Sequence, residues 1–253
     1  MGKIQLILSA LAIGYVSLGL FLYIFQRDYL YFPSYKYDHP HQVKTFHPDN
    51  ESIEVIVLNE DHEKAIIYFG GNGEAVVNGA SDHINNFPTH TIYLVNYRGY
   101  GGSSGKPEEK TIYADALHIY DELSALHSDI AVIGRSLGSS VATYIGSKRE
   151  IEKMVLVTPF DSIERIAQSQ YPLFPVSLLL KDKFDSISRV SAIGAKTLVI
   201  LAEQDEVIPL ENSLRLIQAF PVSQITVATI RGAGHNNLSG NEGYHSLMQD
   251  FMR

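Results

Sequence analysis

The fold class of this chain is decided by the stretch Ile130-Ala131-Val132-Ile133-Gly134-Arg135-Ser136-Leu137-Gly138. Its four leading apolar residues predict a buried strand, and they run directly into Gly-x-Ser-x-Gly, which a helical pattern follows. A strand, a sharp turn and a helix in this order lift a serine hydroxyl clear of the edge of a sheet. Gly134 and Gly138 suit this turn, because a side chain at either position would clash where strand and helix come close. The sequence therefore predicts that Ser136 is a nucleophile whose hydroxyl stands clear of the edge of the sheet.

Around this stretch the chain alternates between predicted strands and predicted helices. Apolar runs rich in β-branched residues, most of them without polar alternation, indicate strands that are buried on both faces. We predict strands at Ile53–Leu58, Ala65–Phe69, Thr91–Asn96, Ile130–Ile133, Met154–Thr158, Thr197–Leu201 and Ile225–Ile230. We predict helices at Thr111–His127, Val141–Ser147, Leu210–Phe220 and Tyr244–Met252. This alternation favours an α/β domain with a mostly parallel sheet and helices on both of its faces.

A second match to Gly-x-Ser-x-Gly occurs at Gly101-Gly102-Ser103-Ser104-Gly105. It lies in a glycine run several residues past a predicted strand, and Lys106-Pro107 follows it where a helix would have to begin. The strand and helix that hold a nucleophilic serine are therefore missing on both sides. We interpret Ser103 as a loop residue.

A serine hydroxyl is a poor nucleophile near neutral pH, so it needs a neighbouring base that a carboxylate orients. His235 directly follows the last predicted strand, in a loop that contains glycines, and Asp205 directly follows the strand Thr197–Leu201. Ser136, Asp205 and His235 thus each follow a different strand, at the edge where open α/β sheets place their sites. We predict that these three residues form a catalytic triad.

Two rival carboxylates lie beside the predicted one, at Glu203 and Glu206. Asp205 is preferred because Val207-Ile208-Pro209 after it has the composition of a turn into the next helix.

Ester cleavage by a serine also needs N–H donors for the developing oxyanion. The backbone N–H of Leu137, directly after the nucleophile, is one candidate. A glycine-rich loop, Gly70–Glu74, follows the strand Ala65–Phe69, and its Asn72 N–H is the preferred second donor, with Gly71 as the alternative. The loop has neither Gly-x-Gly-x-x-Gly nor a Walker lysine, so a phosphate cradle is not favoured.

The N-terminal region holds the most apolar segment of the chain. Ile4–Phe25 carries no charge, and as a helix it would be about 33 Å long, enough to cross a hydrocarbon layer of ~30 Å. A cleaved signal peptide is the alternative, since Ala10-Leu11-Ala12 has the small-x-small form, although a long apolar run still follows it. We predict a single-pass membrane anchor over residues 1–28, a tether over 29–50 and a catalytic domain over 51–253. The flanking charges favour a catalytic domain outside the cytoplasm.

The composition excludes several classes of chemistry. The chain has 253 residues and no cysteine, which removes disulfides, zinc–thiolate sites, iron–sulfur clusters and a thiol nucleophile. The net charge is −8 and no Lys/Arg cluster occurs, so we expect no nucleic-acid partner. The predicted mechanism needs no metal and no cofactor. The segment 160–195 is short, which predicts a small lid whose apolar residues either line an acyl slot or belong to the core.

These residues together resemble the α/β-hydrolase superfamily, whose triads follow the chain order Ser…Asp…His. More narrowly, the chain is similar to membrane-anchored members of the α/β-hydrolase-domain-containing 13 type, often labelled serine-aminopeptidase-like. Besides the anchor, the Ser136 turn, Asp205 and His235, the segments that carry this resemblance are Tyr31–Ser34, Asn96–Gly105, Thr158–Ser162, Tyr171-Pro172 and Lys183–Ser186. One departure is Gly70-Gly71-Asn72, where the family usually has His-Gly-Asn.

The resemblance implies an α/β-hydrolase fold and serine-hydrolase activity. Because the anchor would hold the site near a bilayer, we expect a small-molecule or acyl-type substrate, including lipids, whose ester or thioester bond is cleaved through an acyl-enzyme. A serine peptidase or aminopeptidase, and a non-catalytic membrane-anchored binding protein with a hydrolase-like fold, are the alternatives.

Overall fold

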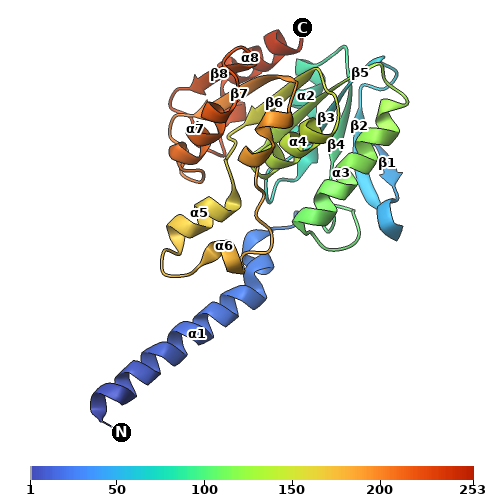
Figure 1. Cartoon of the computed structure of the whole chain (residues 1–253). Helices are drawn as coiled ribbons and strands as arrows, with labels where there is room; N and C mark the ends of the chain where they lie inside the picture. Colours follow the sequence, from blue (N-terminus) through green and yellow to red (C-terminus); the bar gives the residue numbers. More distant parts are fainter. Residues whose placement is uncertain (1) are drawn as a thin grey trace.

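An eight-stranded sheet in the order β1-β2-β4-β3-β5-β6-β7-β8 forms the centre of the computed structural model, which describes residues 2–253 (Figure 1). The strands are β1 (Gln42–Phe46), β2 (Ile53–Leu58), β3 (Lys64–Phe69), β4 (Thr91–Val95), β5 (Asp129–Arg135), β6 (Lys153–Val157), β7 (Lys196–Ala202) and β8 (Ile225–Ile230). β1 with β2 and β2 with β4 are antiparallel pairs, and all other neighbours are parallel. The predicted mostly parallel sheet is confirmed.

Helices cover both faces of this sheet, as predicted. These helices are α2 (Ala80–Asn86), α3 (Glu109–Ser124), α4 (Leu137–Lys148), α7 (Leu210–Ala219) and α8 (Glu242–Met252). Two short helices, α5 (Ile163–Gln170) and α6 (Val176–Leu179), lie beyond the end of the sheet (Figure 1). Successive side chains of a strand point to opposite faces. In β3, Ile67 and Phe69 accordingly join a core that includes residues of α3, α4 and α7, whereas Ile66 and Tyr68 join a second core that includes residues of α2 and α8. Burial on both faces explains why most strands read as continuous apolar runs.

Strand β1 departs from the sequence prediction. Residues 42–46 were assigned to a tether ending at residue 50, but they pair antiparallel with β2. Only Phe46 of this edge strand is buried, while Gln42 and Val43 are exposed. An edge strand with one buried residue lacks the apolar run that marks the other strands. The prediction of a tether is therefore wrong for these residues.

The N-terminal helix α1 (Lys3–Leu30) projects away from the α/β domain (Figure 1). It is long and apolar enough to cross a membrane, and none of its residues is buried within the protein. The chain enters the domain directly after it, at the buried Tyr31. Beside α1 lies a pair of short helices that periodicity did not predict, α5 and α6. We call residues 163–180 the α5–α6 hairpin.

Candidate active site

Ser136 stands at the turn between β5 and α4 in a conformation that few side chains adopt. Its φ is 50° and its ψ is −114°, and positive φ is costly for any residue but glycine. A Cβ on Gly134 would overlap the carbonyl of Gly138, and a Cβ on Gly138 would overlap the carbonyl of Phe69. The two glycines therefore let β3, β5 and the start of α4 approach closely enough to hold the strained turn.

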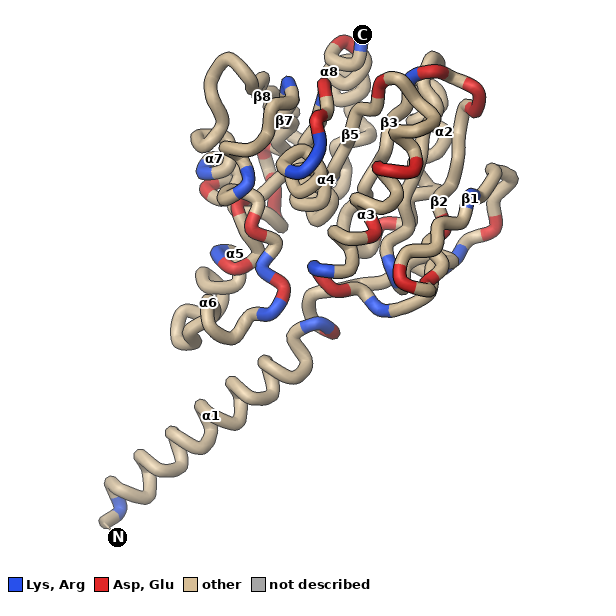
Figure 2. Tube along the Cα trace, turned by 45° about the vertical axis from the view of Figure 1, so that its right-hand side comes forward, with Lys and Arg blue, Asp and Glu red and all other residues tan. Residues whose placement is uncertain are grey.

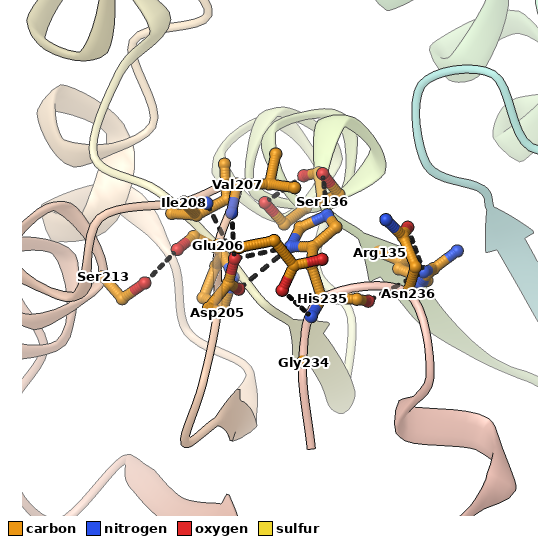
Figure 3. A network of polar contacts seen from close by, with 12 residues as sticks. Arg135, Ser136, Asp205, Glu206, Val207, Ile208, Ser213, Gly234, His235 and Asn236 are labelled. Atoms are coloured by element: carbon orange, nitrogen blue, oxygen red, sulfur yellow. Dashed lines mark hydrogen bonds and ion pairs between the residues drawn. The ribbon is translucent and has the colours of Figure 1, made fainter. Parts of the chain in front are cut away.

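The structure brings the three residues of the predicted triad together (Figure 3). The Ser136 hydroxyl oxygen lies 3.0 Å from Nε2 of His235. On the other side of the ring, Nδ1 of His235 lies 3.0 and 2.9 Å from the two carboxylate oxygens of Asp205. A carboxylate at Nδ1 requires the proton there, which leaves Nε2 free to accept the proton of Ser136. His235 is only 4 % exposed, so water competes little for these bonds.

Asp205 is held in its charged form by the turn that follows it. Its Oδ1 accepts the N–H groups of Val207 at 2.9 Å and Ile208 at 2.7 Å. Burial alone would raise the pKa of this carboxyl group, but the hydrogen bonds from His235 and these two N–H groups outweigh burial and lower the pKa. Asp205 thus carries a full negative charge near neutral pH, as the orienting partner of an imidazole needs.

The two rival carboxylates bind the backbone of the histidine loop instead of the imidazole. Glu206 Oε2 accepts the N–H of His235 at 3.0 Å, and Glu203 Oε2 accepts the N–H of Gly232 at 2.8 Å. Together they fasten the β8 loop to the β7 loop. The geometry therefore favours Asp205 as the carboxylate that orients His235.

The predicted oxyanion donors belong to two segments next to Ser136, the start of α4 and the loop after β3. Leu137 is the first residue of α4, so its N–H has no acceptor within the helix and points outward from the positive end of the helix dipole. Gly71 lies against the nucleophile, since a Cβ added to it would be 3.6 Å from Ser136 Cβ. The N–H of Gly71 already donates to Glu74 at 2.7 Å. The N–H of Asn72 therefore stays the preferred second donor, as a prediction.

A carboxylate that the sequence analysis did not single out, Glu74, organises this loop. Its Oε2 accepts the N–H of Gly71 and, at 2.8 Å, Nη1 of Arg135, while its Oε1 accepts the Tyr68 hydroxyl at 2.7 Å. Burial and the Glu74 charge hold the pKa of Tyr68 well above its usual value, so this hydroxyl keeps its proton. Arg135 Nη2 also donates to the carbonyl of His235 at 3.0 Å. One ion pair thus connects the loop after β3 with the histidine loop.

Ser103, in the second match to the serine motif, is a loop residue. Its hydroxyl donates to the carbonyl of Asn96 at 3.0 Å and accepts the N–H of Glu54 at 2.9 Å. Both hydrogen-bonding functions are used by backbone groups. Its role is to fix the loop after β4.

The sheet order and the placement of the site at the strand ends are those of the α/β-hydrolase fold. The structure superimposes on an esterase of Pyrococcus furiosus with a TM-score of 0.72 and 16 % identity, over 88 % of this chain and 95 % of that one. At this identity the likeness shows the fold, and it confirms the predicted α/β-hydrolase fold. No protein-family model matches the chain.

Curated relatives point the same way by sequence. An uncharacterized protein of Mycobacterium tuberculosis is 36 % identical over 152 residues, covering 58 % of this chain and 53 % of that protein. The α/β-hydrolase-domain-containing protein 17C of Mus musculus is 30 % identical over 64 % of this chain and 50 % of the relative. An uncharacterized membrane protein of Saccharomyces cerevisiae is 29 % identical over 64 % of this chain and 60 % of the relative.

The chain thus spans about half the length of the curated relatives it matches. Their names support the α/β-hydrolase superfamily. The narrower resemblance to the α/β-hydrolase-domain-containing 13 type stays a prediction.

Proposed function

We propose that this protein is a serine hydrolase that cleaves carboxylic ester or thioester bonds through an acyl-enzyme. The observation that carries the proposal is the 3.0 Å contact between the Ser136 hydroxyl and Nε2 of His235, whose Nδ1 is bound to Asp205. Hydrogen-bond contact between nucleophile and base, with the base oriented by a third group, is the arrangement that activates a serine.

The reaction proceeds in two halves. His235 Nε2 takes the proton of Ser136 while the serine oxygen attacks the carbonyl carbon, and Asp205 stabilises the imidazolium that forms. The imidazolium then protonates the leaving alcohol or thiol, which departs and leaves the acyl group on Ser136. Water enters, gives a proton to His235 and attacks the acyl-enzyme. The acid is released and the serine regains its proton.

The negative charge that develops on the carbonyl oxygen is stabilised by the N–H groups of Leu137 and Asn72 in this proposal. The first N–H is at the N-terminus of α4, where the helix dipole favours an anion. The second is in the loop that Glu74 and Arg135 fasten beside Ser136. Preorganised donors of this kind contribute about 3–4 kcal/mol each to transition-state stabilisation.

We further propose that α1 anchors the enzyme in a membrane, so that it meets acyl substrates at the bilayer. The length and apolar composition of α1 support this, as does the name of the yeast relative, an uncharacterized membrane protein. A segment of ~20 apolar residues is long enough to cross the hydrocarbon layer.

Labelling with a fluorophosphonate probe, which reacts with activated serines, tests the proposed nucleophile. We expect the wild-type protein and a Ser103→Ala variant to be labelled and to hydrolyse p-nitrophenyl esters, and Ser136→Ala to do neither. Equal labelling of the wild type and Ser136→Ala would sink the proposal. Acyl thioesters and aminoacyl-anilides assayed beside the esters identify the bond that is cleaved.

A further inference from the structure

The α5–α6 hairpin has a surface that suits lipid better than water. Residues 166–180 contain no charged side chain, and the hairpin's charges lie at its base, as Figure 2 shows. Leu173 is 79 % exposed and Leu178 is 81 % exposed. Large apolar side chains that protrude together from a short hairpin mark an interaction surface.

The hairpin lies along the apolar part of α1. The Tyr15 hydroxyl donates to the carbonyl of Leu173 at 2.7 Å, and the Tyr15 ring stacks on Phe174 with centroids 4.8 Å apart. Nearer the domain, Gln26 Nε2 donates to the carbonyl of Leu179 at 3.2 Å. Contacts at both levels show that hairpin and helix run side by side (Figure 1).

These contacts set the depth of the hairpin in a membrane. Tyr15 precedes Phe25, the last residue of the apolar segment Ile4–Phe25, by ten positions, or about 15 Å of helix. That distance is half of the ~30 Å hydrocarbon layer. An α1 that spans the bilayer therefore carries Leu173 and Phe174 to the middle of it.

Several polar backbone groups of the hairpin tip have partners within the protein, which hydrocarbon requires because it offers no water. Pro172 and Pro175 have no N–H to satisfy. The side-chain amide of Gln168 donates to the carbonyls of Tyr171 at 3.4 Å and Phe174 at 3.1 Å, and its oxygen accepts the N–H of Val176 at 3.2 Å. Together with the Tyr15 hydroxyl on Leu173, these bonds replace the water that an exposed turn would otherwise need.

Between the hairpin and α1 lies a cavity of about 240 Å³. Its walls are made by residues such as Leu22 and Leu30 from α1 and Ile166, Phe174 and Val176 from the hairpin, and no charged side chain lines it. The carbonyl of Leu30, one of the wall residues, accepts a hydrogen bond of 2.6 Å from Nδ2 of Asn72, in the loop beside Ser136. The wall of the cavity is thus bonded directly to the loop that lies against Ser136.

We propose that the α5–α6 hairpin is inserted in the bilayer beside α1, and that the cavity between them receives the acyl chain of a lipid ester resident in that bilayer. This inference rests on the proposed function. The uncharged lining suits a hydrocarbon chain and rejects a charged headgroup, since an unpaired charge is costly in an apolar site. An entrance between a spanning helix and an inserted hairpin lets the acyl chain enter the cavity from the bilayer without passing through water.

The insertion is tested by fluorescence quenching, independently of activity. Because the chain has no cysteine, Leu173→Cys in the full-length protein carries a single environment-sensitive fluorophore after reconstitution in phosphatidylcholine nanodiscs. We expect quenching by lipids with a spin label deep in the acyl chain to exceed quenching by headgroup-labelled lipids at least twofold.

The matched control for the quenching experiment is Val222→Cys. Val222 is 91 % exposed and precedes β8, so it lies at the opposite end of the strands from the site. A fluorophore there is expected to be quenched by aqueous iodide and not by lipid labels. Equal iodide quenching of the fluorophores at 173 and 222 overturns the insertion.

The cavity is tested by filling it from either wall with Leu22→Trp or Ala167→Trp. We expect the ratio of kcat/KM for p-nitrophenyl palmitate to kcat/KM for p-nitrophenyl butyrate to fall at least tenfold in both variants. Leu20→Trp, on the same helix but 57 % exposed and outside the cavity, is expected to keep the wild-type ratio. An unchanged ratio in both filled variants overturns the acyl-chain site. If the wild type hydrolyses neither ester and the fluorophosphonate probe does not label Ser136, the proposed function and the acyl-chain site fail together, whereas the quenching experiment still decides whether the hairpin is inserted.

Discussion

The two Gly-x-Ser-x-Gly segments, 101–105 and 134–138, share a pattern but differ in every physical respect that matters for catalysis. Ser136 has a positive φ between a strand and a helix, and its hydroxyl meets an imidazole. Ser103 lies in a loop, and its hydroxyl is bound to two backbone groups. A glycine at each flank is therefore not what makes a serine reactive. The strained turn that aims the hydroxyl at a base is the feature that distinguishes them.

The glycines themselves are needed for different reasons in the two segments. Gly134 and Gly138 are constrained by backbone carbonyls, which cannot move without separating β3, β5 and α4. In the second segment, Gly101 and Gly105 have φ of 55° and 80°, and a Cβ on any of its glycines would meet side-chain atoms instead of a backbone carbonyl. Backbone contacts therefore constrain the first segment, whereas the second needs glycine for its left-handed backbone conformation.

The largest effect is expected from disturbing the oriented base, which Ser136 contacts and Ser103 does not. Asp205→Asn would let the imidazole adopt the wrong tautomer, and we expect kcat for ester hydrolysis to fall about 10⁴-fold. Glu206→Gln, whose amide oxygen can still accept the N–H of His235, is expected to stay within about threefold of the wild type. Comparable losses in the two variants would contradict the assignment of Asp205.

The second-largest effect is expected on stability, when a glycine of segment 134–138 gains a methyl group. Gly138→Ala places a carbon against the carbonyl of Phe69, and we expect it to lower the free energy of unfolding by about 3 kcal/mol or to prevent folding. Gly102→Ala, which meets only the Glu54 side chain, is expected to cost about 1 kcal/mol. Urea denaturation of both variants measures the difference, and equal costs would remove the distinction drawn between backbone and side-chain constraints.

A smaller effect is expected at Glu74, which supports the reactive segment through Arg135. Glu74→Gln weakens a charge-assisted bond worth about 1.5–3 kcal/mol, so kcat/KM is expected to fall about tenfold to hundredfold. The matched change Glu211→Gln, at a side chain 84 % exposed on α7, is expected to have no effect on the rate. A wild-type rate in Glu74→Gln would show that the ion pair does not position the oxyanion loop.

Removing the second serine tests its structural role. Ser103→Ala leaves the carbonyl of Asn96 and the N–H of Glu54 without their partner, and we expect a loss of about 1–2 kcal/mol in the free energy of unfolding. The rate of ester hydrolysis is expected to stay at the wild-type level. A loss of activity without a loss of stability would show that Ser103 has a part in the chemistry.

The smallest effect concerns stability in acid. The pKa of Asp205 is lower in the folded protein than its usual 3.8, so its charge stabilises the fold above that pH. This contribution is lost as the pH falls through the folded value. Below pH 4, the unfolding free energy of Asp205→Asn is therefore expected to depend less on pH than that of the wild type. Parallel pH profiles from thermal unfolding would contradict this.

Much of the fold and the candidate site could be predicted from the sequence, because their signals are local. Continuous apolar runs located β2 through β8, and the strand-end positions of Ser136, Asp205 and His235 predicted that they would meet. The edge strand β1 was missed because only one of its residues is buried. Glu74 was missed because its partners Gly71, Tyr68 and Arg135 are assembled only when β3 and β5 pair.

The sequence by itself determined the α/β-hydrolase fold, the strained serine turn and a helix apolar enough to span a membrane, since these depend on residue type, spacing and local periodicity. The sequence favoured Asp205 over Glu203 and Glu206, but only the tertiary structure shows the contacts that separate the three carboxylates, because the turn after β7 aims Asp205 at His235 and leaves the two glutamates on backbone N–H groups. The tertiary structure also decided that the α5–α6 hairpin lies along α1 and encloses a cavity with it. The sequence of residues 160–195 does not distinguish apolar residues of the core from apolar residues that line a pocket, because only packing separates these two environments.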